Sequence, residues 1–155
     1  MNQDIQQWVA GLGLEPHVEG GYYKQLYKAV TGEGQAQYTS ILFLLLEDNP
    51  SHFHRLSVDE VWYYHAGQAV TVHEITPDGQ YLQTHLGPDI QAGQVLQHCV
   101  PKGHIFGSTV ETGYGLVGCM CSPGFEYEDF KLFQRADLLA AYPEHKDIIT
   151  RLTRG

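Results

Sequence analysis

The chain has 155 residues, of which 43% are hydrophobic and 17% charged, so it fits one packed domain over 1–155 and not a disordered chain. Its formal net charge of −9 disfavours nucleic acid and anionic membrane surfaces as partners, because both are negatively charged. Seventeen glycines and an aromatic content of 12% favour strands and tight turns over helices.

The first predicted element is a short amphipathic helix over residues 2–10. Ile5, Trp8, Val9 and Leu12 follow the i, i+3, i+4, i+7 spacing of one helical face, and glycines follow the stripe. Apolar runs separated by Gly and Pro then recur about every 8–12 residues, which indicates an all-β sandwich or barrel. These runs cover residues 22–27, 38–46, 61–65, 69–75, 81–86, 95–100, 104–109 and 114–121.

Two further elements are expected near the C-terminus. Apolar residues at helical spacing on either side of Pro143 predict two short helices, which we expect to pack on the outside of the barrel. Between them and the last apolar run lies the acidic segment 126–129. Its alternation with aromatic residues favours a half-buried strand with the acids facing outward.

Cysteine content and the N-terminal segment bear on the cellular location. The cysteines are Cys99, Cys119 and Cys121, and an odd number argues against a disulfide framework. The N-terminus lacks a basic region followed by a long apolar run, and no segment approaches the roughly 18 apolar residues of a membrane span. We therefore expect a cytoplasmic protein without membrane contact.

The segment 51–67, SHFHRLSVDEVWYYHAG, carries the most informative pattern for chemistry. On a strand, His52 and His54 point to the same face, and a turn at 57–59 lets the next strand run back with Glu60 at its start. Two imidazoles and one carboxylate suit a divalent metal such as Zn, Mn, Fe or Ni. The alternative is a pair of histidines that only hydrogen-bond in a ligand pocket, so the sequence predicts one metal or none.

The same segment resembles the first motif of the cupin family, which is HxH followed by a Glu and then a Gly. The second cupin motif is matched in part by Gly93 and the Pro101-x-Gly103 turn, but Phe106 stands where the family has a histidine. The resemblance is closer to the DUF985 (Cupin_5) branch of RmlC-like cupins. It rests on PHVEGGYYKQLY, TSILFLL, SHFHRLSVDEVWYYHAG, GLVGCMCSPGFEYEDF and LLAAYPEHKDII.

That resemblance implies a double-stranded β-helix, the cupin jelly roll, commonly assembled as a homodimer. It implies no established activity, so function is argued from the candidate site. His104 shares strand parity with Phe106 and is predicted either to face the cavity, as a ligand or base, or to lie at the rim. His73 and His85 have no neighbours in the sequence that suggest a role.

Several other residues are predicted to line the pocket. The segment 19–24, EGGYYK, resembles the pocket-lining segment of sugar-nucleotide 3,5-epimerases, which implies that Tyr22, Tyr23 or Lys24 contacts the substrate. Its glycines favour a tight bend over the barrel mouth. The alternative is an edge strand that pairs with a second subunit. Arg55 is a candidate partner for an anionic substrate group. The aromatic residues Trp62, Tyr64 and Phe106 are predicted to make the cavity mostly apolar.

Three functions remain open at this point. The first is an isomerase or epimerase acting on a carbohydrate-like or other polar metabolite, in which His54 or His52 removes a proton next to a carbonyl and Tyr64 or a metal stabilises the enolate. The second is a non-catalytic protein that binds or senses a small molecule. The third is a metal-dependent dioxygenase with iron at His52, His54 and Glu60.

Overall fold

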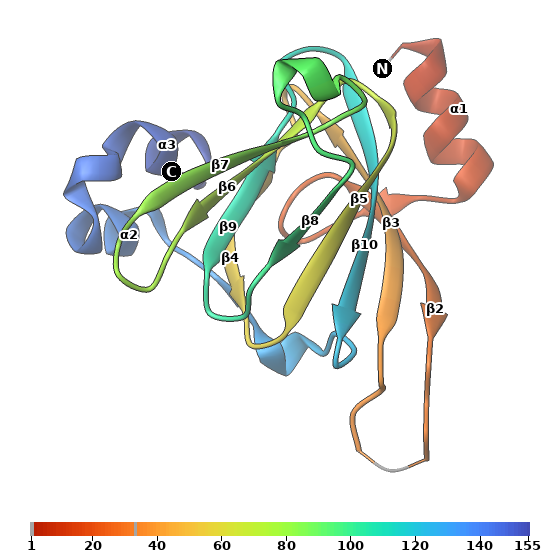
Figure 1. The fold of residues 1–155 in the computed structure, drawn as a ribbon, viewed down its shortest axis with the longest axis horizontal. Helices are drawn as coiled ribbons and strands as arrows, with labels where there is room; N and C mark the ends of the chain where they lie inside the picture. Colours follow the sequence, from red (N-terminus) through yellow and green to blue (C-terminus); the bar gives the residue numbers. More distant parts are fainter. Residues whose placement is uncertain (1, 33) are drawn as a thin grey trace.

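A computed structural model describes residues 2–32 and 34–155, and Figure 1 shows their arrangement. Strands dominate the fold, and helices lie at both ends of the chain. In chain order the elements are α1 (Gln3–Leu12), β1 (Glu15–Pro16), β2 (Tyr22–Lys28), β3 (Thr39–Leu46), β4 (Ser51–Leu56), β5 (Asp59–Gly67), β6 (Val70–Ile75), β7 (Tyr81–Leu86), η1 (Ile90–Ala92), β8 (Gln97–Val100), β9 (Ile105–Thr109), β10 (Tyr114–Ser122), η2 (Tyr127–Asp129), β11 (Phe130–Leu132), α2 (Arg135–Ala141), η3 (Pro143–His145) and α3 (Lys146–Arg151).

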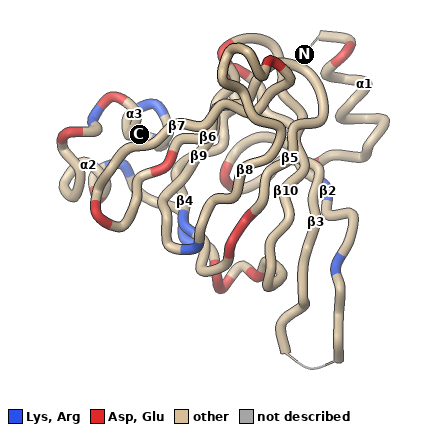
Figure 2. The backbone as a smooth tube through the Cα atoms, viewed as in Figure 1, with Lys and Arg blue, Asp and Glu red and all other residues tan. Residues whose placement is uncertain are grey.

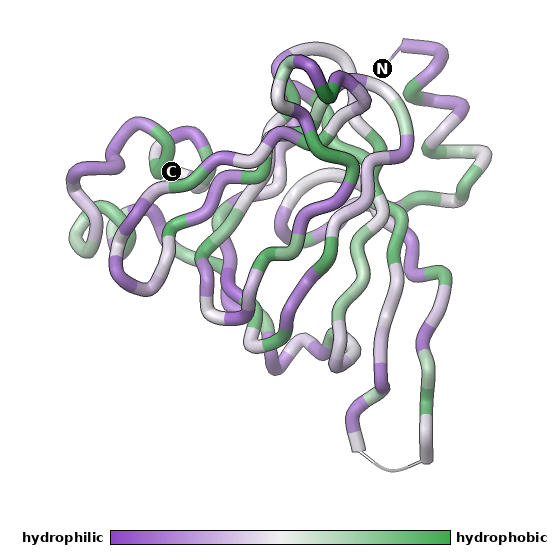
Figure 3. Tube along the Cα trace, viewed as in Figure 1, coloured by the Kyte–Doolittle hydropathy of each residue, from purple (hydrophilic) through white to green (hydrophobic). Residues whose placement is uncertain are grey.

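The strands form two antiparallel sheets that face each other. One has the order β1-β2-β3-β10-β5-β8 and the other β11-β4-β9-β6-β7. Hydrophobic and hydrophilic residues alternate along much of their length (Figure 3), so each sheet turns one face inward. The inward faces bury an apolar cluster that includes Phe43, Trp62, Val72, Phe106 and Val117. The predicted all-β jelly roll is confirmed.

The N-terminal helix α1 covers the outer face of the first sheet. The side chain of Asn2 caps it by accepting a hydrogen bond from the backbone N–H of Ile5 at 2.9 Å. Gly13 ends it in the left-handed conformation at φ 67°. Ile5 packs with Leu44 and Leu116 of the strands below, as an amphipathic helix requires.

The C-terminal helices α2 and α3 cover part of the outer face of the second sheet, on the side opposite α1 (Figure 1). Leu138 of α2 and Ile149 of α3 pack against Phe53, Ile75 and Ile105 of the strands. The two predicted helices are confirmed. Among the residues that the structure describes, no helix is both long enough and apolar enough to cross a membrane.

Two local expectations are wrong. The strand that carries Glu60 does not run back beside the strand that carries His54, because β4 pairs with β9 and β11 whereas β5 pairs with β10 and β8. The short turn between them crosses from one sheet to the other, so the two residues approach across the barrel. The acidic segment 126–129 is also not a strand, since η2 begins at Tyr127 and β11 begins only at Phe130.

Candidate active site in the barrel

A cavity of about 200 Å³ lies between the two sheets, inside the barrel. Side chains from β2, β3, β4, β5, β10 and β11 line it, together with residues that precede β2 and β11. Gln25 and Tyr127 are the exposed members of its lining and mark the side that faces solvent. Its ionisable groups include His17, Glu19, His54 and Glu60.

A tight bend before β2 brings Glu19 into the barrel. Gly20 and Gly21 have φ values of 112° and 74°, which side chains rarely permit. A Cβ atom on Gly20 would lie 1.9 Å from the carbonyl oxygen of Pro50, so only glycine fits there. The backbone N–H of His52 donates to the carbonyl of Glu19 at 2.7 Å and fixes the bend against the start of β4. The predicted bend is confirmed.

The hydrogen bonds of His54 identify its charge state. Its Nδ1 lies 2.7 Å from the carbonyl oxygen of His52, which can only accept, so Nδ1 carries a proton. Its Nε2 lies 3.0 Å from an oxygen of Glu19, and beside an ionised carboxylate this contact is favourable only when Nε2 also carries a proton. Both nitrogens are then protonated, and the ring is an imidazolium.

Electrostatics support the same conclusion. Burial lowers the pKa of His54, but the charge of Glu19 and its hydrogen bond outweigh burial and raise that pKa above its usual value. The pKa of Glu19 is lowered to about 2: burial raises it, and His54, His17 and the hydroxyl of Ser51 more than offset that effect. The pair is therefore an ionised carboxylate and an imidazolium, both buried.

Glu60 is a third ionisable group in the cavity, and it differs from Glu19 in its surroundings. The thiol of Cys121 donates to its carboxylate, with the sulfur 3.3 Å from the oxygen. Burial and the negative charge of Glu19 raise its pKa to about 7, although His54 acts in the opposite direction. Glu60 is thus poised to take up or release a proton near neutral pH.

His52 is not where the sequence places it. The register between β4 and β9 shifts between Ser51 and His54, so the alternation that would align the two histidines is broken. The Nδ1 of His52 donates to the carbonyl of Glu19 at 2.7 Å, and its side chain does not line the cavity. Burial lowers its pKa.

The three aromatic residues that were predicted to line the cavity, Trp62, Tyr64 and Phe106, do not line it. Phe106 and Trp62 are buried in the surrounding core. The ring centres of Phe106 and His54 lie 4.2 Å apart. The indole N–H of Trp62 lies near Glu60 and lowers its pKa, yet it meets no acceptor in hydrogen-bonding geometry among the described residues. Tyr64 donates its hydroxyl to the carbonyl of Gly67 at 2.8 Å instead.

Two of the other predicted contacts also point elsewhere. Tyr23 lines the cavity, and burial and the nearby Tyr127 raise its pKa to about 12. Lys24, its neighbour, has the opposite parity on β2 and approaches Gly13 outside the barrel. Arg55 is exposed on the outer face of β4, where its guanidinium lies 5.3 Å from the ring centre of Phe133.

His104 belongs to a separate cluster. Its Nδ1 lies 2.8 Å from one carboxylate oxygen of Glu74, and the Nε2 of His98 lies 2.7 Å from the other. The cluster connects β6 of one sheet with β8 of the other, and none of its three members lines the cavity. His104 is therefore not beside His54, as the first alternative for its position required.

His54 and Glu60 line the cavity and His52 does not, so the expected three ligands do not converge. Within residues 2–32 and 34–155, no group of three or more His, Cys, Asp or Glu side chains is arranged to hold a metal ion. The residues present do not fit the predicted metal.

Among the cavity residues that the sequence did not identify are four with polar side chains. His17, Glu19, Cys121 and Tyr127 belong to no local motif with His54. The sequence held one signal for Glu19, which directly precedes two glycines. A Gly-Gly bend at that point turns the chain and so sets the direction of the Glu19 side chain. The other three follow only from the three-dimensional arrangement.

Two facing antiparallel sheets around an enclosed cavity with His and Glu side chains define a cupin-type barrel. Comparison with known families agrees, because the family model described as "Cupin superfamily (DUF985)" matches residues 6–133. The chain belongs to this family.

Two of the similar solved structures share the fold over nearly the whole chain. Protein SO0799 from Shewanella oneidensis is 46% identical with a TM-score of 0.94, covering 99% of this chain and 98% of that chain. A hypothetical protein from Leishmania major is 36% identical with a TM-score of 0.92, covering 97% and 98%. The uncharacterised yeast protein YML079W (Saccharomyces cerevisiae) is 29% identical over 87% of this chain and 78% of its own length.

More distant structures include an enzyme. Oxalate decarboxylase from Bacillus subtilis has a TM-score of 0.59 at 12% identity, covering 88% of this chain and 36% of that chain. At this identity the likeness concerns the fold alone.

Proposed function

We propose that the barrel cavity binds a small polar metabolite, carbohydrate-like or similar, and performs acid–base chemistry on it of the isomerase or epimerase type. The observation that carries the proposal is the placement of Glu60 in the same buried cavity as the Glu19–His54 pair, whose side chains lie 3.0 Å apart. The pKa of Glu60, raised to about 7 by burial and by the charge of Glu19, supports it. Perturbed pKa values in an enclosed cavity are typical of catalytic groups.

The chemistry divides between the two sides of the cavity. Ionised Glu60 removes a proton from the carbon next to a substrate carbonyl, and the same carboxyl returns it to that carbon or its neighbour. As the proton leaves carbon, and before it is returned, negative charge develops on the carbonyl oxygen, and the positive charge of the His54 imidazolium stabilises it. Glu19 keeps His54 protonated, so it acts as a positioning residue. Glu60 replaces His54 or His52 as the proposed base, and His54 replaces Tyr64 as the proposed group that stabilises the enolate.

A second candidate is a non-catalytic protein that binds or senses a small molecule in the same cavity. It is favoured by the pairing around His54, where both ring nitrogens and both oxygens of Glu19 already have partners. Such an arrangement leaves fewer free groups for a reacting substrate. The third function, a metal-dependent dioxygenase, needs ligands that the described side chains do not bring together.

Solvent deuterium exchange separates the two candidates even before the substrate is identified. A panel of aldoses, ketoses and 2-keto acids is incubated with the protein in D₂O, and mass spectrometry detects exchanged C–H positions. We expect exchange with the native chain and with Glu74→Gln, which alters a buried carboxylate outside the cavity, and none with Glu60→Gln. Thermal stabilisation by a panel member without any exchange would favour the binding protein.

We also propose a cytoplasmic homodimer that binds neither nucleic acid nor membrane. The hairpin of β2 and β3 extends beyond the barrel (Figure 1), and apart from two lysines on β2 its described residues are uncharged (Figure 2). It exposes Leu26, Tyr27, Val30 and Tyr38, a grouping that favours contact with a second copy. Light scattering tests this, since Leu26→Glu with Tyr27→Glu should convert a dimer to a monomer.

A further inference from the structure

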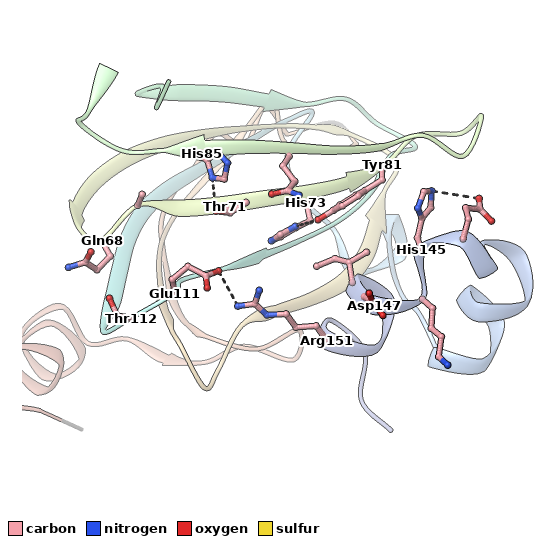
Figure 4. A pocket seen from close by; sticks show the side chains of 15 residues that line it. Gln68, Thr71, His73, Tyr81, His85, Glu111, Thr112, His145, Asp147 and Arg151 are labelled. Atoms are coloured by element: carbon pink, nitrogen blue, oxygen red, sulfur yellow. Dashed lines mark hydrogen bonds and ion pairs between the residues drawn. The ribbon is translucent and has the colours of Figure 1, made fainter. Parts of the chain in front are cut away.

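A second and larger cavity lies outside the barrel, on the outer face of the second sheet. Its volume is about 770 Å³, and it runs between β6, β7 and the C-terminal helix α3 (Figure 4). We call it the outer groove. It begins where the helices stop covering the sheet: Ile75 and Ile105 are buried beneath them, whereas the next outward residue on β6 is His73.

The floor of the groove is a fixed hydrogen-bond network around His73. Its Nδ1 lies 2.6 Å from the hydroxyl of Tyr81, and its Nε2 lies 2.8 Å from the hydroxyl of Thr109. Burial, reinforced by Arg151, lowers the pKa of His73 to about 4, so the ring is neutral at physiological pH. The rings of His73 and Tyr81 are nearly parallel, with an angle of 8° and centres 5.9 Å apart. The floor is therefore hydrogen-bonded, uncharged and partly aromatic.

The walls present polar groups to the space between β7 and α3. Arg151 reaches across from α3 to Glu111 at 3.2 Å (Figure 4), so its charge is compensated. His85 binds the hydroxyl of Thr71 through Nδ1 at 2.8 Å, and no hydrogen bond of its Nε2 is found within the described residues. Gln83 is exposed next to His85 on the same strand face and contributes an amide donor and acceptor.

We infer that the outer groove is a binding site for a neutral, polyhydroxylated molecule of sugar type. Its lining presents two carboxamides, the hydroxyl of Thr112 and the Nε2 of His85 beside the ring of Tyr81, a combination that suits the hydroxyl groups and the apolar face of a sugar. Its charged side chains, three acidic and two basic, nearly cancel, so neither a strongly anionic nor a strongly cationic ligand is favoured. The volume fits a molecule of mono- or disaccharide size.

This site is separate from the proposed active site. Adjacent residues on a strand point to opposite faces, so His73 faces the groove while Glu74 faces the barrel interior. The groove shares no lining residue with the inner cavity. Binding in the groove therefore does not depend on whether Glu60 and His54 are catalytic.

Saturation-transfer NMR tests the inference with named probes: glucose, galactose, N-acetylglucosamine and maltose, with glucose 6-phosphate and spermidine as charged comparisons. We expect at least one neutral sugar to bind at concentrations of about 10 mM or below. Gln83→Leu and His85→Phe should each weaken that binding about tenfold or more. Gln97→Leu, an exposed glutamine on β8 outside the groove, and Glu60→Gln should leave it unchanged.

Several outcomes would overturn the inference. These are no binding by any neutral sugar, binding that survives both groove variants, or binding of the charged probes alone. A dimer that dissociates in Gln83→Leu would also overturn it, because the groove would then be covered by a second copy. Loss of sugar binding in Glu60→Gln with retention in the groove variants would place the sugar in the inner cavity instead.

Discussion

The barrel holds two clusters of the same residue types, and they differ in what surrounds them. In the inner cavity, Glu19 binds His54 at 3.0 Å, and a second carboxyl, Glu60, stands nearby in an enclosed space. At the edge between the sheets, Glu74 binds His98 and His104 at 2.7 and 2.8 Å, and both of these histidines are partly exposed. Only the first of these two clusters borders the inner cavity.

The contrast shows that a Glu–His pair alone does not make a site. Both clusters lower the pKa of one glutamate through histidine partners, against the effect of burial. The inner cluster alone adds a further carboxyl whose pKa moves upward, to about 7. A stable ion pair beside a group that exchanges protons at neutral pH is the arrangement that supports chemistry.

The largest expected difference between the two clusters is in the stability lost when the glycine next to each is replaced by alanine. Gly20→Ala should lower the free energy of unfolding by about 4 kcal/mol, because the new methyl group meets the Pro50 carbonyl oxygen and φ is positive. Gly103→Ala, beside His104, should cost about 1 kcal/mol, because φ is again positive but nothing lies within 4 Å. Chemical denaturation measures both. Equal losses would mean that the bend before β2 is not as tight as described.

The next largest difference is expected when the glutamate that binds histidine in each cluster is replaced by glutamine. Glu19→Gln should destabilise the fold by about 3 kcal/mol at pH 7, because the buried imidazolium of His54 loses its partner. Glu74→Gln should cost about 1 kcal/mol, since solvent reaches His98 and His104 and can replace the lost interaction. Denaturation at matched pH compares them. A greater loss in Glu74→Gln would reverse the assigned importance of the clusters.

Replacing Glu60 should have the opposite effect on stability to replacing Glu19. Its folded-state pKa of about 7 lies above the ordinary 4.5, so the native chain loses stability as the pH rises between these values. A rise of this size corresponds to about 3 kcal/mol at most. Glu60→Gln should therefore stabilise the fold by up to about 3 kcal/mol at pH 8 and change it little at pH 4. Unfolding curves at the two pH values give the measurement, and destabilisation at pH 8 would contradict the assignment.

A last expected effect is the loss of stability in acid, and it concerns His73. The pKa of His73 is lowered from 6.5 to about 4, so the unfolded chain takes up a proton between these values while the folded chain does not. Stability should fall as the pH drops through that window, and His73→Gln should remove about 1–3 kcal/mol of that pH dependence. Parallel pH titrations of unfolding measure it. An unchanged slope in the variant would mean that His73 is already solvated in the fold.

The strands were predictable because they are bounded by Gly and Pro and alternate in hydropathy, and α1 was predictable from the stripe that contains Ile5 and Trp8. His54 and Glu60 were predictable because they belong to a local motif. His52 was misplaced, since the register shift between Ser51 and His54 depends on pairing with β9 and has no local signature. Glu19 was missed because its approach to His54 spans 35 residues and depends on the Gly-Gly bend.

The central claim is that Glu60 titrates near neutral pH because it is buried beside an ionised Glu19–His54 pair. Carbon-13 NMR of side-chain carboxyl groups tests it directly, with Glu60 assigned by the signal that disappears in Glu60→Gln. We predict a pKa of about 7 for Glu60 and about 2 for Glu19 in the same titration. A pKa for Glu60 near the ordinary 4.5 would contradict the account.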